Sequence, residues 1–300
     1  MGFDFLSLKS LFPLWYNFSA MKKRLLLHIC CAPDGVYIPE KLSEEYEVVC
    51  YFYNPNIYPK EEYEKRKREM ERVAKAKGYK LVVGEYDFEN FTKNAEKLYY
   101  LPEKSKRCDF CLSLRLEDSA KKAKELNCDI FATVLTVSPH KDFEKINEIG
   151  EKVAKKYGIE YLPSNFKKND GFKKSVEEGK KLNLYRQDYC GCESSLVYRQ
   201  MFKDAEKGDV VFLVRGEKVG IYDIDSVKKH VERNGLKTAF VFYEKKPTDN
   251  VLEYAYQNRL FLEPLDNLQW RKRIFEKKGK KVEILDLKDI SNRDIFLDPC

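Results

Sequence analysis

The chain has 300 residues, of which 43% are hydrophobic and 35% are charged, and its formal net charge is +7. This composition is typical of a globular protein of one or two domains and excludes a disordered chain. No apolar run is long enough to cross a membrane, and the first residues, with Asp4, Lys9 and Pro13, make a poor signal peptide. We therefore expect a cytoplasmic protein with reduced thiols and no membrane partner.

Strand-like and helix-like segments alternate over the first two thirds of the chain. Residues 24–29 are an apolar, strand-like run, and residues 61–77 have the period of a charged amphipathic helix that Gly78 ends. Alternation of this kind predicts an α/β fold, with a mostly parallel sheet and helices on both of its faces. Further strands are expected at 47–53, 81–83, 130–137 and 160–162, and further helices at 35–42, 108–126 and 143–157.

The composition changes near residues 203–209, and a new series of strands and helices begins. Strands are expected at 210–214, 219–222, 238–243 and 260–262, and helices from Ser226 and Asn250. We therefore expect a poorly packed amino-terminal extension (1–20), a first domain (21–203) and a small carboxyl-terminal α/β domain of unknown role (204–300). Met21 is an alternative start, because a buried strand begins shortly after it.

Positive charge is concentrated in two segments. Residues 270–281 hold seven Lys or Arg against Glu276, and residues 167–181 hold six lysines against three acids. Such runs fit a surface that binds nucleic acid, and they also fit a solvated surface rich in Lys and Glu. The sequence leaves both interpretations open.

Six of the nine cysteines stand in three pairs that only folding can bring together. Thiolates are preferred ligands of zinc and of iron–sulfur clusters, and seven candidate ligands exceed one four-ligand zinc site. Buried, inert thiols explain one such pair more easily than three. The pattern therefore predicts a metal centre, whose candidate ligands are Cys30, Cys31, Asp34, Cys108, Cys111, Cys190 and Cys192.

The local spacing of each pair affects how its sulfurs can reach a metal. Cys108 and Cys111 lie one helical turn apart, and the glycine of Cys190-Gly-Cys192 allows a tight bend. Neighbours in an extended strand point to opposite faces. Cys30 and Cys31 can therefore reach one metal only if the chain turns there, and otherwise they serve different sites.

Five segments, in this order, resemble the QueH family of epoxyqueuosine reductases over residues 22–202. The first twenty residues and everything after about residue 205 lie outside the resemblance. The segments are His28-Ile-Cys-Cys-Ala-Pro-Asp34, Phe52-Tyr-Asn-Pro-Asn-Ile-Tyr-Pro59, Arg107-Cys-Asp-Phe-Cys111, Leu135-Thr-Val-Ser-Pro-His-Lys141 and Leu184-Tyr-Arg-Gln-Asp-Tyr-Cys-Gly-Cys192.

The resemblance implies an oxidoreductase that converts epoxyqueuosine to queuosine at the wobble position of tRNA, the final step of queuosine biosynthesis. It further implies a Rossmann-like (HUP-like) domain and a [4Fe-4S] cluster held by three cysteines and an aspartate. A second mononuclear metal ion, iron or zinc, would lie nearby, and how the ligands divide between the two groups stays open. The family commonly has a cysteine where this chain has Asp34. No Gly-rich phosphate loop follows the first strand, so we do not expect ATP to be used.

Removal of the epoxide oxygen consumes two electrons and two protons, so an external one-electron donor, ferredoxin- or flavodoxin-like, is expected. Among three histidines, His140 is the expected proton donor, with a structural or positioning role as the alternative, and His28 is expected to support the site. Asp34 is the expected ligand that leaves one iron open to the epoxide oxygen, because a hard carboxylate exchanges more readily than a thiolate.

Polar side chains beside the predicted ligands are candidates for binding the substrate, although loop capping would also explain them. Lysines at 167, 168, 173 and 174 are candidates for contacts to tRNA phosphates. Two other functions stay open, namely a zinc-stabilised tRNA-binding protein and a tRNA sulfur-transfer enzyme. The substrate candidates are Asn54, Asn56, Tyr58, Arg186, Gln187 and Asp188.

Overall fold

The computed structural model describes residues 22–290, except for the side chains of residues 216 and 217. The expected extension at 1–20, the alternative start at Met21 and the terminal Cys300 lie outside the described residues. Between residues 22 and 290, no helix is long and apolar enough to span a bilayer.

The first sheet is parallel throughout and has the strand order β3-β2-β1-β4-β5, which is the order of a Rossmann-like fold. The central strand β1 pairs with β2 on one side and with β4 on the other, and both of its faces are buried. Burial on both faces explains the unbroken apolar run Leu25–Leu27. The strands are β1 (Arg24–Ile29), β2 (Glu47–Phe52), β3 (Lys80–Val83), β4 (Ile130–Thr133) and β5 (Glu160–Tyr161).

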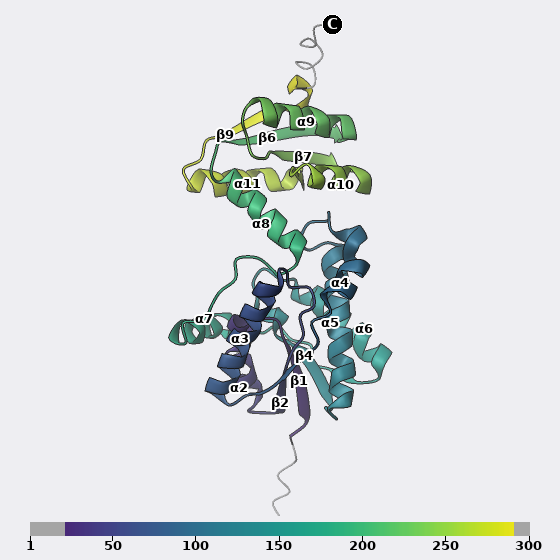
Figure 1. The fold of residues 1–300 in the computed structure, drawn as a ribbon, viewed down its shortest axis with the longest axis vertical. Coiled ribbons are helices and arrows are strands. Elements are labelled where there is room, and N and C mark those ends of the chain that lie inside the picture. Colours follow the sequence, from purple (N-terminus) through teal and green to yellow (C-terminus); the bar gives the residue numbers. More distant parts are fainter. Residues whose placement is uncertain (1–21, 291–300) are drawn as a thin grey trace, which may run out of the picture.

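Helices cover both faces of this sheet, which confirms the predicted α/β fold (Figure 1). One face packs on α1, α2, α3 and α7, and the other packs on α5 and α6. Gly78, at φ 70°, ends α3, and Asp142 caps α6 by accepting from the amide nitrogens of Glu144 and Lys145. The helices are α1 (Ala32–Gly35), α2 (Ile38–Leu42), α3 (Lys60–Lys77), α4 (Phe88–Ala95), α5 (Lys106–Glu125), α6 (Phe143–Tyr157) and α7 (Gly171–Lys181), with a 3-10 turn η1 (Glu96–Leu98).

Some predicted elements were wrong in extent or type. The strand expected at 130–137 ends at Thr133, whose hydroxyl accepts from the Leu135 amide and starts the 3-10 turn η2 (Val134–Val137). The helix expected at 35–42 is two short helices, α1 and α2. The strand expected at 219–222 is instead the start of a helix, because Gly220 is its N-cap.

A second parallel sheet, with the order β8-β7-β6-β9, follows in the chain and confirms the predicted small α/β unit. One of its faces packs on α9 and α10, and the other packs on α11 and on α8 (Glu193–Ala205). Its elements are β6 (Val210–Lys218), α9 (Ile221–Arg233), β7 (Phe240–Lys245), α10 (Asp249–Gln257), β8 (Phe261–Pro264), η3 (Leu265–Asn267), α11 (Leu268–Lys277) and β9 (Val282–Asp286).

Helix α8 (Glu193–Ala205) joins the two units (Figure 1). Near its start, the Ser194 hydroxyl donates to the Tyr99 carbonyl at 2.6 Å and the Tyr198 hydroxyl donates to the Tyr100 carbonyl at 2.9 Å. Near its end, Phe202 packs on Phe261 of the second sheet, with ring centroids 4.5 Å apart. The domain boundary expected at 203 and 204 falls within this helix and stays a prediction.

Two helical glycines give a matched test of the packing. A Cβ at Gly150 in α6 would lie 2.3 Å from the Tyr161 ring, whereas a Cβ at Gly179 in α7 would lie 3.8 Å from Leu184. Gly150→Ala should destabilise the chain by about 1–3 kcal/mol through overpacking. Gly179→Ala should be neutral or stabilising by up to about 1 kcal/mol, because alanine favours helix. Urea unfolding of both variants checks this, and equal effects would contradict the packing at Tyr161.

Candidate metal centre

The predicted ligands come from three distant segments and meet at the carboxyl ends of the first sheet's strands. Cys30 and Cys31 follow β1, Cys108 and Cys111 lie in the first two turns of α5, and the Cys190-Gly-Cys192 loop leads into α8. This edge is where open parallel sheets bind ligands.

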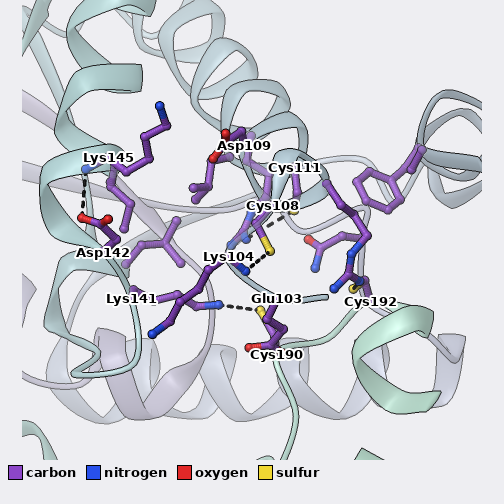
Figure 2. A pocket seen from close by; sticks show the side chains of 18 of the residues that line it. Glu103, Lys104, Cys108, Asp109, Cys111, Lys141, Asp142, Lys145, Cys190 and Cys192 are labelled. Carbon is purple, nitrogen blue, oxygen red and sulfur yellow. Dashed lines mark hydrogen bonds between the residues drawn. The ribbon is translucent and has the colours of Figure 1, made fainter. Parts of the chain in front are cut away.

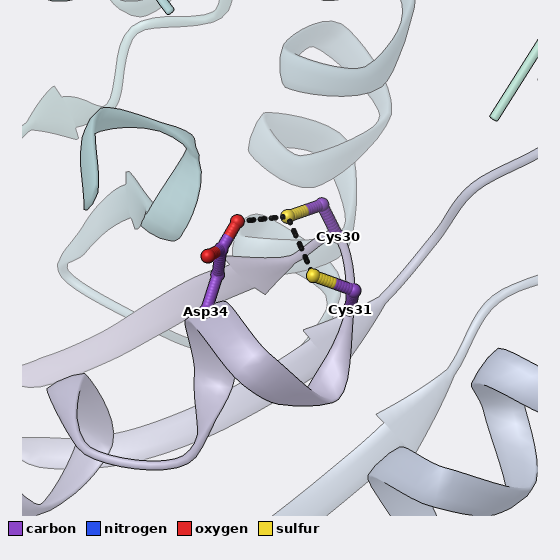
Figure 3. A group of neighbouring side chains, drawn as sticks. All are labelled: Cys30, Cys31 and Asp34. Carbon is purple, nitrogen blue, oxygen red and sulfur yellow. Dashed lines mark hydrogen bonds between the residues drawn. The ribbon is translucent and has the colours of Figure 1, made fainter. Parts of the chain in front are cut away.

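Cys30, Cys31 and Asp34 form a compact group (Figure 3). The Cys30 Sγ lies 3.7 Å from the Cys31 Sγ and 3.3 Å from the Asp34 Oδ2, and the three ligand atoms all lie within 4.8 Å of one another. The two neighbouring sulfurs converge because the chain turns into α1 directly after Cys31, with a proline in the first turn of that helix. The strand pattern that would separate them therefore ends at Cys30.

This group favours a bound cation. The contact with Cys31, together with burial, raises the pKa of the Cys30 thiol well above its usual range, and burial raises the pKa of Asp34. A bound metal ion would lower both pKa values, because its positive charge stabilises the thiolate and the carboxylate.

The other four predicted ligands, Cys108, Cys111, Cys190 and Cys192, line one pocket at the start of α5 (Figure 2). Cys190 also lines a neighbouring cleft, which contains Cys30 and Asp34. The structure therefore divides the predicted ligands by position into a carboxylate-containing group after β1 and four thiols in the pocket beside it, with Cys190 next to both.

Three cations, Arg107, Arg115 and Lys141, lie against the thiols of the pocket. The Arg107 Nη1 donates to the Cys192 Sγ at 2.7 Å, and the Lys141 Nζ donates to the Cys190 Sγ at 2.9 Å. The Arg115 Nη1 lies 4.0 Å from the Cys111 Sγ. Both arginines are buried.

The charges oppose burial to different degrees at different thiols. Burial by itself would raise the pKa of Cys190, but the charge and hydrogen bond of Lys141, together with the charge of Arg115, lower the pKa on balance. At Cys111, burial dominates and raises the pKa to about 12, even with Arg115 nearby. Cys190 is therefore the most readily ionised thiol of this pocket for which a shift is resolved.

The pocket fits a negatively charged, sulfur-rich metal group. Among the described residues, Arg107 Nε and Nη2 and Arg115 Nε are buried without a hydrogen-bond partner, and Asn56 Oδ1 is also unpaired. Buried N–H donors require hydrogen-bond acceptors, and an anionic acceptor also balances the charge of a guanidinium group. Thiolates and sulfides of a metal cluster would supply such acceptors. The cysteine ligands and the positive charge around them therefore both fit a negatively charged metal cluster.

The cleft beside the first ligand group has a volume of about 450 Å³ and contains several predicted substrate residues. His140 is exposed at this cleft, and Arg186, Gln187 and Asp188 line it together with Cys30 and Asp34. The carboxylate of Asp188 pairs with Lys203 at 2.7 Å and with Arg199 at 3.2 Å. The hydrogen bond from Lys203 lowers the pKa of Asp188, so this residue carries a negative charge at the edge of the cleft.

The remaining predicted substrate residues lie elsewhere. Asn54 is buried and holds the site together, because its Nδ2 donates to the Ile29 carbonyl at 2.9 Å and its Oδ1 accepts from Arg115 at 2.7 Å. Asn56 lines the thiol pocket, and Tyr58 stacks on Phe88 at 5.5 Å between ring centroids. Neither Asn54 nor Tyr58 lines the cleft or the thiol pocket.

His28 supports the site from within the sheet. It is fully buried, with its Nδ1 2.9 Å from the Thr133 hydroxyl and its Nε2 3.1 Å from the Tyr53 carbonyl. Burial, with Arg115 nearby, lowers its pKa well below the usual value. A neutral His28 thus links the ends of β1, β2 and β4.

Sequence reasoning missed the three cations of the pocket. Arg107 and Lys141 stand inside the quoted segments, and Arg115 lies one helical turn after Cys111. Their proximity to cysteines in the sequence was an available signal for Arg107 and Arg115. Only the fold brings Lys141 to Cys190, 49 residues away.

A family described as "Epoxyqueuosine reductase QueH" matches residues 25–197. Curated relatives with the same description are 38% identical in Staphylococcus epidermidis, over 62% of this chain and 83% of the relative, and 38% identical in Thermotoga maritima, over 59% of this chain and 92% of the relative. A solved structure, described as a predicted subunit of tRNA methyltransferase from Methanocaldococcus jannaschii, gives a TM-score of 0.37 at 17% identity over 52% of this chain and 76% of that chain, which is too low to carry an argument. From the match over residues 25–197 and these relatives, the chain belongs to the QueH family of epoxyqueuosine reductases and is an oxidoreductase.

Proposed function

We propose that this chain reduces epoxyqueuosine to queuosine at the wobble position of tRNA, at a centre with a [4Fe-4S] cluster and a second metal ion. The observation that carries the proposal is the meeting of the seven predicted ligands at one edge of the first sheet, beside buried cations with free N–H groups. Family membership supports the reductase activity.

The ligands would be Cys30, Cys31 and Asp34 after β1 and the four thiols of the neighbouring pocket. When bound, the metal groups supply electrons and Lewis acidity to the site. The cations Arg107, Arg115 and Lys141 hold the thiol ligands in place and balance their charge.

The cleft beside Asp34 is the proposed position of the modified base. Arg186, Gln187 and Asp188 would hold its polar groups, and His140 would give a proton to the departing epoxide oxygen. The reaction takes up two electrons and two protons, breaks both C–O bonds of the epoxide, and forms an alkene and water. The electrons would come from an external one-electron donor.

The direct test is conversion of tRNA that carries epoxyqueuosine by anaerobically reconstituted protein with dithionite, followed by nucleoside analysis. We expect queuosine from the native chain and from Cys128→Ala, a thiol outside the site, and no queuosine from Cys190→Ala. In the same assay His140→Gln should slow conversion at least about 100-fold, whereas His230→Gln on α9 should not.

An intact cluster without conversion would contradict the proposal. A colourless protein that holds zinc alone would favour a tRNA-binding protein, and a thiolated nucleoside would favour sulfur transfer.

Asp34 tests whether an exchangeable oxygen ligand matters. Asp34→Cys should keep the iron content, because a thiolate also binds iron, but should lower turnover at least about tenfold, because a thiolate exchanges less readily than a carboxylate. Iron analysis and the rate of queuosine formation check this. Full turnover in Asp34→Cys would contradict an open coordination position at Asp34.

Lys141 tests the effect of charge on the metal centre. Lys141→Met removes the cation 2.9 Å from the Cys190 Sγ, so the midpoint potential should move to more negative values. Lys141→Arg should restore most of the native potential. Lys145→Met is the matched control, because Lys145 lines the same pocket but pairs with Glu148 at 3.1 Å. A dye-mediated redox titration measures the potentials, and an unchanged value in Lys141→Met would refute the electrostatic role.

A further inference from the structure

The second sheet and its helices lie beyond the residues that the family shares. The family match ends at residue 197, and the Thermotoga maritima relative is covered over 92% of its own length by an alignment of 179 residues. Residues 206–290 are therefore an addition to the shared reductase part.

Helix α11 carries cations that are not used within the fold. Arg273 and Lys277 are exposed and form no ion pair among residues 22–290. Two arginines of this unit are paired: Arg259 with Asp204 at 3.0 Å, and Arg271 with Glu263 at 2.8 Å. The unpaired cations of α11 are therefore available to a partner.

An exposed aromatic side chain lies on the same face of α11. Trp270, Arg273 and Lys277 are spaced by three and four residues, which places them in one stripe, while Leu268 and Phe275 are buried against the sheet. Trp270 is 54% exposed. An indole beside unpaired cations is a common arrangement in surfaces that bind nucleic acid, where rings stack on bases and cations hold phosphates. We call these three residues the α11 stripe.

The α11 stripe lies one helix length from the metal centre. α11 packs beside α8 on the side of the second sheet that faces the first sheet (Figure 1), and the Arg271 guanidinium lies 4.4 Å from the centre of the Phe202 ring. Cys192 is the N-cap of α8, so Phe202 stands about 15 Å further along that helix. A partner that contacts both places must span at least this distance.

We propose that the α11 stripe binds the body of the tRNA while the wobble base occupies the cleft. Arg273 and Lys277 would contact phosphates, and Trp270 would pack on an exposed base or ribose. This inference rests on the proposed function, because tRNA is the substrate only there. An acidic electron-donor protein would also suit the cations, but the exposed Trp270 indole beside them favours a nucleic acid, whose bases stack on aromatic rings.

Affinity for an unmodified tRNA transcript and for its isolated anticodon stem–loop, measured over a series of salt concentrations, tests the proposal without any need for metal. Arg273→Gln with Lys277→Gln should weaken binding of the whole tRNA and reduce the slope of log affinity against log salt by about two. Trp270→Ala should weaken it about tenfold with little change in slope. Binding of the stem–loop should be unchanged in both variants.

The matched control is Lys228→Gln with Lys229→Gln, which removes two exposed cations from α9 on the other face of the sheet. This variant should bind tRNA like the native chain. Native affinity in the α11 variants would overturn the inference, and so would slower reduction by a ferredoxin with unchanged tRNA binding, which would assign the stripe to the electron donor. A native chain that binds no tRNA would instead contradict the proposed function.

Discussion

Charge balance around buried sulfur is the constraint on which the site depends. A thiolate in a protein interior is costly unless a cation or a metal lies beside it. Here Arg107 and Lys141 lie within hydrogen-bond distance of Cys192 and Cys190. The cations are themselves costly to bury, and some of their N–H groups find no acceptor within the described protein. The buried thiols therefore favour a bound metal, and the buried cations favour a metal group that is negatively charged and rich in sulfur.

The fold supplies the geometry that this balance requires. The parallel order of β1, β2 and β4 brings their carboxyl ends to one edge, and buried His28 links the three strand ends. Asn54 then joins the end of β1 to Arg115 of α5. Uncharged polar side chains such as Asn54 thus fix the position of the charged Arg115. Helix α8 connects Cys192 to the core of the second unit.

The sequence predicted most of the fold because its strands and helices are strongly patterned. The run at 24–29 and the helix at 143–157 have the predicted bounds, since burial on both faces and an Asp cap with a closing glycine leave clear signals. The strand at 130–137 was predicted too long, because Val134–Val137 is as apolar as a strand while Thr133 bends the backbone. Helix α8 was not predicted, although Val197, Met201 and Ala205 pack on the second sheet at helical spacing.

The site was predictable as a set of ligands but not as an electrostatic unit. Cysteine pairs are visible in a sequence, and the chain turns after Cys31, as the convergence of the two neighbouring sulfurs requires. The pairing of Lys141 with Cys190 depends on tertiary structure alone. Asn54 shows the opposite case, because its polar side chain suggested a substrate contact and instead satisfies the Ile29 carbonyl and Arg115.

The central claim is that these ligands hold two distinct metal groups. Mössbauer spectroscopy of the native chain, reconstituted anaerobically with isotopically enriched iron and sulfide, tests it most directly. We predict the signal of a [4Fe-4S] cluster in which one iron differs from the others, with a separate metal ion found by elemental analysis. A protein that binds a single zinc ion and shows no cluster signal after reconstitution would contradict it.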